Sequence, residues 1–132
     1  MESDRQEQKR DSTSPACLFP PAFIRLGEGD FHARLAATPG VAAVLFSTPH
    51  CGACRAWKRL LPVALAGVAD ALYEVDVGEA TGVARYYGIF HLPTIHLHRD
   101  GQFHAELQCE AGMAAVRDTT LKLLAEAPRE EP

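Results

Sequence analysis

The sequence predicts an α/β fold built around a single sheet. Stretches of β-type apolar residues alternate with helical patterns through the first two thirds of the 132 residues. This alternation is typical of βαβ units, whose strands are parallel. Further along, Asp100-Gly101 separates two strand-like stretches, which is a strong signal for an antiparallel hairpin. The length favours one domain, and an apolar content of 47% is ample for one core.

Local residue patterns predict the helices and strands along the chain. Asp30 is a suitable N-cap for the first helix, and Pro39-Gly40 follows its end. The run Val41–Ser47 is apolar on both faces, which indicates a buried central strand. Pro62 lies inside the next helix, where its missing N–H predicts a kink. The expected elements are strand 22–26, helix 31–37, strand 41–47, helix 53–69, strand 72–77, helix 79–87, strands 94–99 and 102–108, and helix 113–127.

Polar ends flank the predicted domain, which we expect to span residues 19–127. Residues 1–18 form a polar tail that we expect to be disordered, and residues 128–132 a flexible C-terminus. The tail lacks the apolar core of a signal peptide, and no apolar stretch is long enough for a membrane span. The net charge of −4 includes no basic patch interleaved with aromatics. We therefore expect a cytoplasmic monomer without nucleic-acid or membrane partners.

The motif Cys51-Gly52-Ala53-Cys54 follows the central strand and opens a helix. At a helix start, a sulfur faces unpaired backbone N–H groups and the positive end of the helix dipole. Both favour a thiolate, so we predict a lowered pKa for Cys51 and the role of nucleophile. Cys54, three residues later, can resolve a mixed disulfide. The isolated Cys17 and Cys109 are interpreted as free thiols rather than a second redox pair.

The sequence over residues 19–127 resembles the thioredoxin family. Beyond the two cysteines, the resemblance rests on Tyr87-Gly88-Ile89, Leu92-Pro93-Thr94 and the Asp100-Gly101 hairpin. It implies a thioredoxin-like fold, with a central mixed sheet of about five strands and helices on both faces. It also implies that Pro93 is cis and lies beside the Cys51 sulfur. The backbone of Leu92 would then be exposed to pair with an extended substrate chain.

Several positions depart from the family pattern. Leu45 and Leu72 stand where the resemblance implies a buried aspartate and its lysine partner, and that carboxylate would accept a proton from the resolving thiol. The replacement predicts slow resolution by Cys54. His50 replaces the aromatic residue before the first cysteine. An imidazolium there would lower the pKa of Cys51 further, whereas a loop histidine without a role is the other interpretation, and both stay open.

The motif favours a thiol–disulfide oxidoreductase, and we expect a disulfide reductase that cycles between the Cys51–Cys54 dithiol and disulfide. Its expected partners are a disulfide-containing protein or small molecule and an unidentified electron donor, with no cofactor. The alternative is a thioredoxin-fold adaptor with little redox turnover. The sequence does not separate a reductase from an oxidase, because that depends on the stability of each redox form.

A zinc-binding module is a third possibility, with ligands from the two cysteines, His50 and His91. Structural zinc usually needs a second ligand pair at short spacing, and neither remaining cysteine belongs to one. A three-histidine site is not expected either. His96 and His98 share a strand face, whereas His104 should lie on the opposite face, across from Leu97. We therefore expect no metal.

Overall fold

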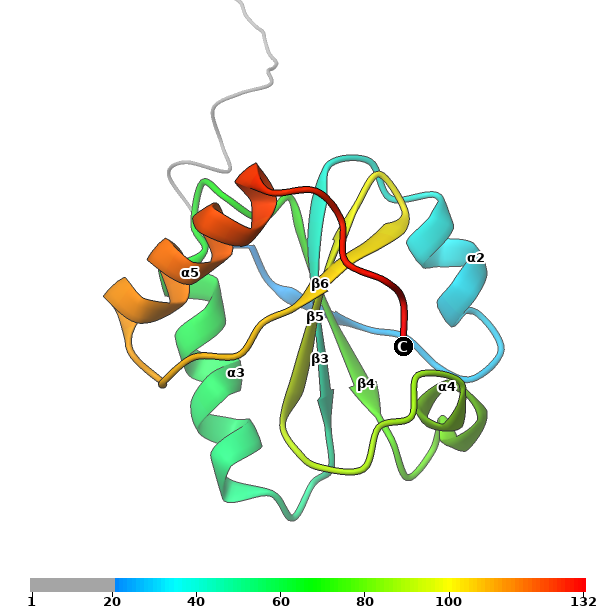
Figure 1. Ribbon diagram of the computed structural model, residues 1–132. Coiled ribbons are helices and arrows are strands. Elements are labelled where there is room, and N and C mark those ends of the chain that lie inside the picture. The colour runs from blue at the N-terminus through cyan, green and yellow to red at the C-terminus, as the bar shows by residue number, and fades with distance from the viewer. Residues whose placement is uncertain (1–20) are drawn as a thin grey trace, which may run out of the picture.

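The computed structural model describes residues 21–132 and places them in a five-stranded mixed sheet with helices on both faces (Figure 1). The predicted fold class is confirmed. The predicted tail, residues 1–18, and Cys17 lie outside the described residues. The elements are β2 (Phe23–Arg25), α2 (Phe31–Ala36), β3 (Val41–Ser47), α3 (Gly52–Ala64), β4 (Ala71–Asp76), α4 (Thr81–Tyr86), β5 (Thr94–Arg99), β6 (Gln102–Glu106) and α5 (Met113–Ala125).

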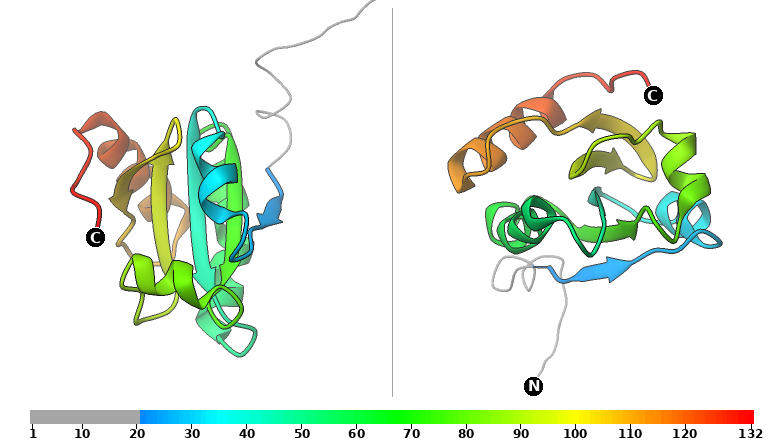
Figure 2. Two further views of the ribbon diagram at one scale, coloured as in Figure 1. Left: turned by 90° about the vertical axis from the view of Figure 1, so that its right-hand side faces the viewer. Right: turned by 90° about the horizontal axis from the view of Figure 1, so that it is seen from below.

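The sheet has the strand order β2-β4-β3-β5-β6, with β2 at one edge and β6 at the other (Figure 2). Strands β2, β4 and β3 are parallel, as expected for βαβ units, whereas β5 and β6 run antiparallel to their neighbours. Phe46 of β3 pairs with Thr94 of β5. The chain leaving β3 and the chain entering β5 therefore meet at the same end of the sheet.

Two apolar clusters fill the space between the sheet and its helices. Helices α3 and α5 cover one face, and α2 and α4 cover the other (Figure 1). The cluster on the α3/α5 face contains Leu45, Leu72 and Leu97, with Trp57 packed against it. The cluster on the opposite face contains Phe46 and other aromatic residues. The residues of β3 from Ala42 to Ser47 are buried, which makes β3 the central strand that the sequence predicts.

The element boundaries differ from the predictions mainly at helix ends. Helix α3 ends at Ala64 rather than near residue 69, because the chain then turns through Gly67, whose φ of +79° lies outside the helical region. Pro62 does lie inside α3. The predicted side-chain N-cap of α2 is wrong: Asp30 makes no cap hydrogen bond to the helix, and its Oδ1 instead accepts one from the Gly27 N–H at 2.7 Å.

The β5–β6 hairpin turns through Asp100 and Gly101, which have φ of 51° and 83°. Both angles are typical of the two-residue turn that the sequence predicts. The predicted pairing of Leu97 with His104 is wrong, because a bulge shifts the register and Leu97 pairs with Ala105. His104 nevertheless faces α5, where its Nε2 lies 2.7 Å from the Leu123 carbonyl oxygen. His96 lies on the other face, as predicted, and its ring contacts the ring of Phe46 there.

The segment after α5 runs back across β6 (Figure 1). The Arg129 N–H donates a hydrogen bond to the His104 carbonyl at 2.6 Å, and the Tyr86 hydroxyl donates one to Glu131 at 3.2 Å. These contacts attach the segment to the domain, and the flexibility expected for residues 128–132 stays a prediction. Within residues 21–132, every helix is too short or too polar to cross a membrane.

Candidate functional site

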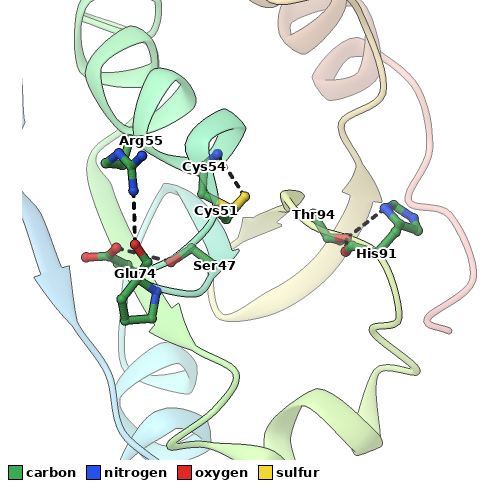
Figure 3. The surroundings of a disulfide bond; sticks show 8 residues. Ser47, Cys51, Cys54, Arg55, Glu74, His91 and Thr94 are labelled. Atoms are coloured by element: carbon green, nitrogen blue, oxygen red, sulfur yellow. Dashed lines mark hydrogen bonds between the residues drawn. A yellow bond between two sulfur atoms is a disulfide. The ribbon is translucent and has the colours of Figure 1, made fainter.

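A disulfide joins Cys51 and Cys54 at the start of α3 (Figure 3). Cys51 occupies the N-cap position in an extended conformation, and its Sγ accepts a hydrogen bond from the Cys54 N–H at 3.0 Å. The Cα atoms of the two cysteines lie 5.2 Å apart. The predicted placement at a helix start is confirmed. A thiolate at Cys51 would accept this N–H and also lie at the positive end of the helix dipole.

The two sulfur-bearing residues differ in their access to solvent. Cys54 is only 2% exposed, whereas Cys51 is partly exposed and the intervening Gly52 and Ala53 are exposed. A bulky disulfide arriving from solvent therefore reaches Cys51 before Cys54. This asymmetry fits an attacking thiol at Cys51 and a resolving thiol at Cys54.

His50 lies in the turn directly before Cys51, and its side chain is exposed. Its ring has no hydrogen-bond or ion-pair partner among residues 21–132. The position allows the imidazole to act on the neighbouring sulfur, and no contact fixes it there. The tuning of Cys51 by His50 stays a prediction.

The loop that enters β5 lies beside the dithiol turn, as the pairing of β3 with β5 requires. The Leu92–Pro93 peptide bond is cis, which confirms that prediction. Thr94 secures the loop, since its hydroxyl donates to the His91 carbonyl at 2.7 Å and lies 3.3 Å from the ring Nδ1 of His91 (Figure 3). Leu92 and Pro93 are both partly exposed. Their backbone pairing with a substrate stays a prediction.

Leu45 and Leu72 are fully buried in the α3/α5 cluster, so the core beneath the dithiol is apolar at these two positions. Sequence reasoning missed a carboxylate close by. Glu74 lies in register with Leu45 on the neighbouring strand and is 9% exposed. Its Oε1 pairs with the Lys58 ammonium at 2.8 Å, and its Oε2 accepts a hydrogen bond from the Ser47 hydroxyl at 3.1 Å.

Two periodicities could have revealed this cluster from the sequence. Side chains alternate along a strand, so Glu74 shares a face with Leu72. Residues four apart on a helix lie on one side, so Lys58 shares a side of α3 with Cys54. A charged residue within the apolar strand β4 was the available signal.

A cavity of about 190 Å³ brings this cluster and the resolving cysteine together. Its walls carry three basic and two acidic side chains, together with the Ser47 hydroxyl and the buried Cys54. The lining residues are Arg25, Ser47, Thr48, Pro49, Cys54, Arg55, Lys58, Glu74 and Asp76. Figure 3 shows Ser47 and Glu74 on one side of the disulfide, with Thr94 and His91 on the other.

His96, His98 and Cys109 do not line this cavity. Burial lowers the pKa of both His96 and His98 from 6.5 to about 4, and the neighbouring His98 contributes to the shift of His96. Burial raises the pKa of the Cys109 thiol, which disfavours its reactive thiolate. Among residues 21–132, no group of three or more histidine, cysteine or acidic side chains is arranged to hold a metal ion.

Residues 22–122 match the thioredoxin family model. The chain is 34% identical over 85 residues to protein disulfide-isomerase A3 from Gallus gallus, a match that covers 60% of this chain and 16% of that protein. The chain thus spans about a sixth of the length of this relative.

Solved structures show the same fold. A mutant thioredoxin from Halobacterium salinarum superposes with a TM-score of 0.68 at 21% identity, covering 89% of this chain and 100% of that one. Reduced Schistosoma mansoni thioredoxin gives a TM-score of 0.65 at 25% identity, covering 77% of this chain and 98% of that one. The family match covers most of the chain, and the site carries the expected cysteine pair and cis-proline. The chain belongs to the thioredoxin family.

Proposed function

We propose that this protein is a thiol–disulfide oxidoreductase whose net direction is reduction of disulfides. Family membership and the Cys51–Cys54 disulfide support the general chemistry. The observation that carries the proposal is the arrangement of the two sulfurs. Cys51 is partly exposed and its Sγ accepts a helix N–H, while Cys54 is buried within reach behind it.

The reaction divides into two exchanges. The Cys51 thiolate attacks one sulfur of the substrate disulfide, forms a mixed disulfide, and releases the other substrate sulfur as a thiolate that takes a proton from solvent. Cys54 then loses its proton and attacks the Cys51 sulfur. The bond from Cys51 to the substrate breaks, the second substrate sulfur leaves reduced, and Cys51–Cys54 becomes the disulfide. A thiol-based electron donor restores the dithiol by the reverse exchanges.

Trapping and labelling test these roles in the full chain. Limiting alkylation of the reduced protein at neutral pH should label Cys51 before Cys54 and before Cys109, whose pKa is raised by burial. Cys54→Ser should accumulate a mixed disulfide with a protein substrate such as insulin, and Cys51→Ser should not. Faster labelling of Cys54, or trapping by Cys51→Ser, contradicts the assignment.

The direction of the reaction needs a separate measurement. Equilibration of the Cys51–Cys54 pair with glutathione gives its reduction potential, which for a reductase should lie near the thioredoxin value of about −270 mV. A potential near about −120 mV, as in strong oxidants, would reverse the proposed direction.

The setting of the reaction is also part of the proposal. We propose a cytoplasmic monomer that acts on disulfides of proteins or small molecules. One observation supports the adaptor alternative: the core beneath the dithiol is apolar at Leu45 and Leu72, so these positions offer no proton acceptor for redox turnover. An adaptor would bind its partner equally well after Cys51→Ser and would show no dithiol-dependent turnover.

A further inference from the structure

We propose that Glu74 accepts the proton of Cys54 during release of the mixed disulfide, through water in the cavity that both residues line. This inference rests on the proposed oxidoreductase function and assigns one proton-transfer step within it. Cys54 is 2% exposed, so few water molecules can contact its thiol directly. The thiol must nevertheless become a thiolate before it attacks the Cys51 sulfur.

Glu74 is placed for this step by contacts from two other elements. Ser47, the last residue of β3, donates a hydrogen bond to Oε2 at 3.1 Å, and Lys58 of α3 pairs with Oε1 at 2.8 Å. Lys58 is four residues after Cys54, so the counter-ion of the carboxylate and the resolving thiol lie on the same side of one helix. The carboxylate is thus fixed beside the element that carries Cys54.

The cavity supplies the path between the two groups. Its volume of about 190 Å³ has room for several water molecules, and its polar walls offer the hydrogen-bond partners that buried water needs. A general base can act through one intervening water. The charged groups that face Glu74 in this cavity are Arg25 from β2, Arg55 and Lys58 from α3, and Asp76 from β4.

Asp76 is the competing carboxylate, and its contacts hold it elsewhere. Its Oδ1 accepts the N–H of Gly78 at 2.8 Å within the turn after β4, and its Oδ2 lies 3.9 Å from Arg25 on the edge strand. Neither contact connects it to α3. Glu74, by contrast, is tied to both β3 and α3, the elements that flank the dithiol turn.

The proton balance of the step is simple. The Cys54 S–H bond breaks, and its proton passes through water to the Glu74 carboxylate. The sulfur lone pair forms the Cys51–Cys54 bond, while the bond from Cys51 to the substrate breaks and the substrate sulfur leaves as a thiolate. The Glu74 carboxylic acid then releases this proton through the cavity to solvent. When a donor later reduces the protein, the Cys54 thiolate takes a proton from water.

The test separates the two exchanges with dithiobis(nitrobenzoate), a symmetrical aromatic disulfide, on the full chain carrying Cys17→Ser and Cys109→Ser. Attack by Cys51 releases the first nitrothiophenolate at a rate proportional to reagent concentration. Resolution by Cys54 releases the second at a rate independent of it, and Cys54→Ser abolishes this second phase. Absence of any first phase from Cys51 refutes the proposed function itself.

Glu74→Gln should leave the first phase unchanged and slow the second by at least about ten-fold at about pH 6.5. The slowed rate should then rise with hydroxide concentration, about ten-fold per pH unit, because the thiol must lose its proton to solvent. Glu110→Gln removes an exposed carboxylate that does not line the cavity and should change neither phase. An unchanged second phase in Glu74→Gln, or an equal slowing in Asp76→Asn, overturns the proposal.

Lys58→Met keeps the test decisive should Glu74→Gln fail to fold. The variant removes the ammonium that contacts Glu74 Oε1 at 2.8 Å and holds the carboxylate beside α3, so the second phase should slow across the pH range while the first phase keeps its rate. A pH profile that superimposes on that of the parent contradicts the role of Glu74.

Discussion

Two buried histidines should make the stability of this protein fall in mild acid. His96 and His98 are only 1% and 2% exposed, and they lie among the rings of Phe46, Tyr87 and Phe103. Among the described residues, His96 Nδ1 and both ring nitrogens of His98 have no hydrogen-bond partner. Burial lowers the pKa of each ring from 6.5 to about 4. Both rings are therefore neutral in the folded protein at neutral pH.

The sign of the effect follows from proton binding in the two states. Between about pH 4 and pH 6.5, the unfolded chain binds protons at these rings that the folded protein does not. The stability that they contribute is complete above the unfolded pKa and is lost as the pH falls toward the folded pKa. At about pH 5 each ring should cost about 2 kcal/mol of unfolding free energy, or about 4 kcal/mol together.

Urea unfolding at about pH 7.5 and about pH 5 measures this loss. The double variant His96→Phe, His98→Phe keeps aromatic side chains in the cluster and removes both titrating groups, so most of the difference between the two pH values should disappear. His50→Ala, at an exposed position, is the control and should behave like the parent. An equal loss of stability in the parent and the double variant would refute the reasoning.

Three further substitutions test the site. Leu45→Asp should lower the free energy of unfolding by about 3–6 kcal/mol, because it removes a fully buried leucine and buries a carboxylate beside Glu74. Because the proposed acceptor Glu74 remains in place, the variant should not speed the second phase, and a folded variant with faster release would contradict the proposal. Phe90 is 90% exposed in the loop before the cis-proline, where a protein substrate could cover it. Phe90→Ala should therefore raise KM for a protein disulfide by about three- to ten-fold and leave the reaction with dithiobis(nitrobenzoate) unchanged. Equal effects on both substrates would show that Phe90 does not contact protein substrates. His50→Ala should raise the pKa of Cys51 in a titration of thiolate absorbance, and superimposable curves would leave His50 without a role.

The fold could be predicted from the sequence because the apolar pattern and the turn residues favour the same elements. The run Val41–Ser47 is apolar on both faces and becomes the buried central strand with the predicted bounds. Asp100-Gly101 gives the turn that its residue types favour. The wrong predictions concern positions whose conformation depends on tertiary or turn contacts. The bulge at His104 accompanies a contact between its ring and the Leu123 carbonyl of α5. The Asp30 side chain accepts a hydrogen bond from the preceding turn rather than from its own helix.

The dithiol and the cis-proline were predictable because short motifs mark them. The cluster around Glu74 has a weaker signal, a single charged residue in an apolar strand, because its three members come from β3, α3 and β4 and lie far apart in the sequence. The sequence shows that a carboxylate is missing at Leu45, and only the strand register shows another beside that position. The slow resolution by Cys54 expected from Leu45 stays a prediction, and the proposed role of Glu74 is the alternative to it.

The position of Glu74 also has an energetic advantage over a carboxylate at Leu45. A charge at the fully buried Leu45 would need a counter-ion brought into the apolar cluster, at a large desolvation cost. Glu74 lines a cavity, and Lys58 reaches it with a side chain that is 46% exposed, so the ammonium keeps much of its hydration. The core beneath the dithiol can then remain packed with leucines, because the ionisable pair lies at its edge. With this arrangement, the leucines stabilise the core and Glu74 serves as the proposed proton acceptor. A single carboxylate at Leu45 would have to accept the proton and also fit within the apolar core.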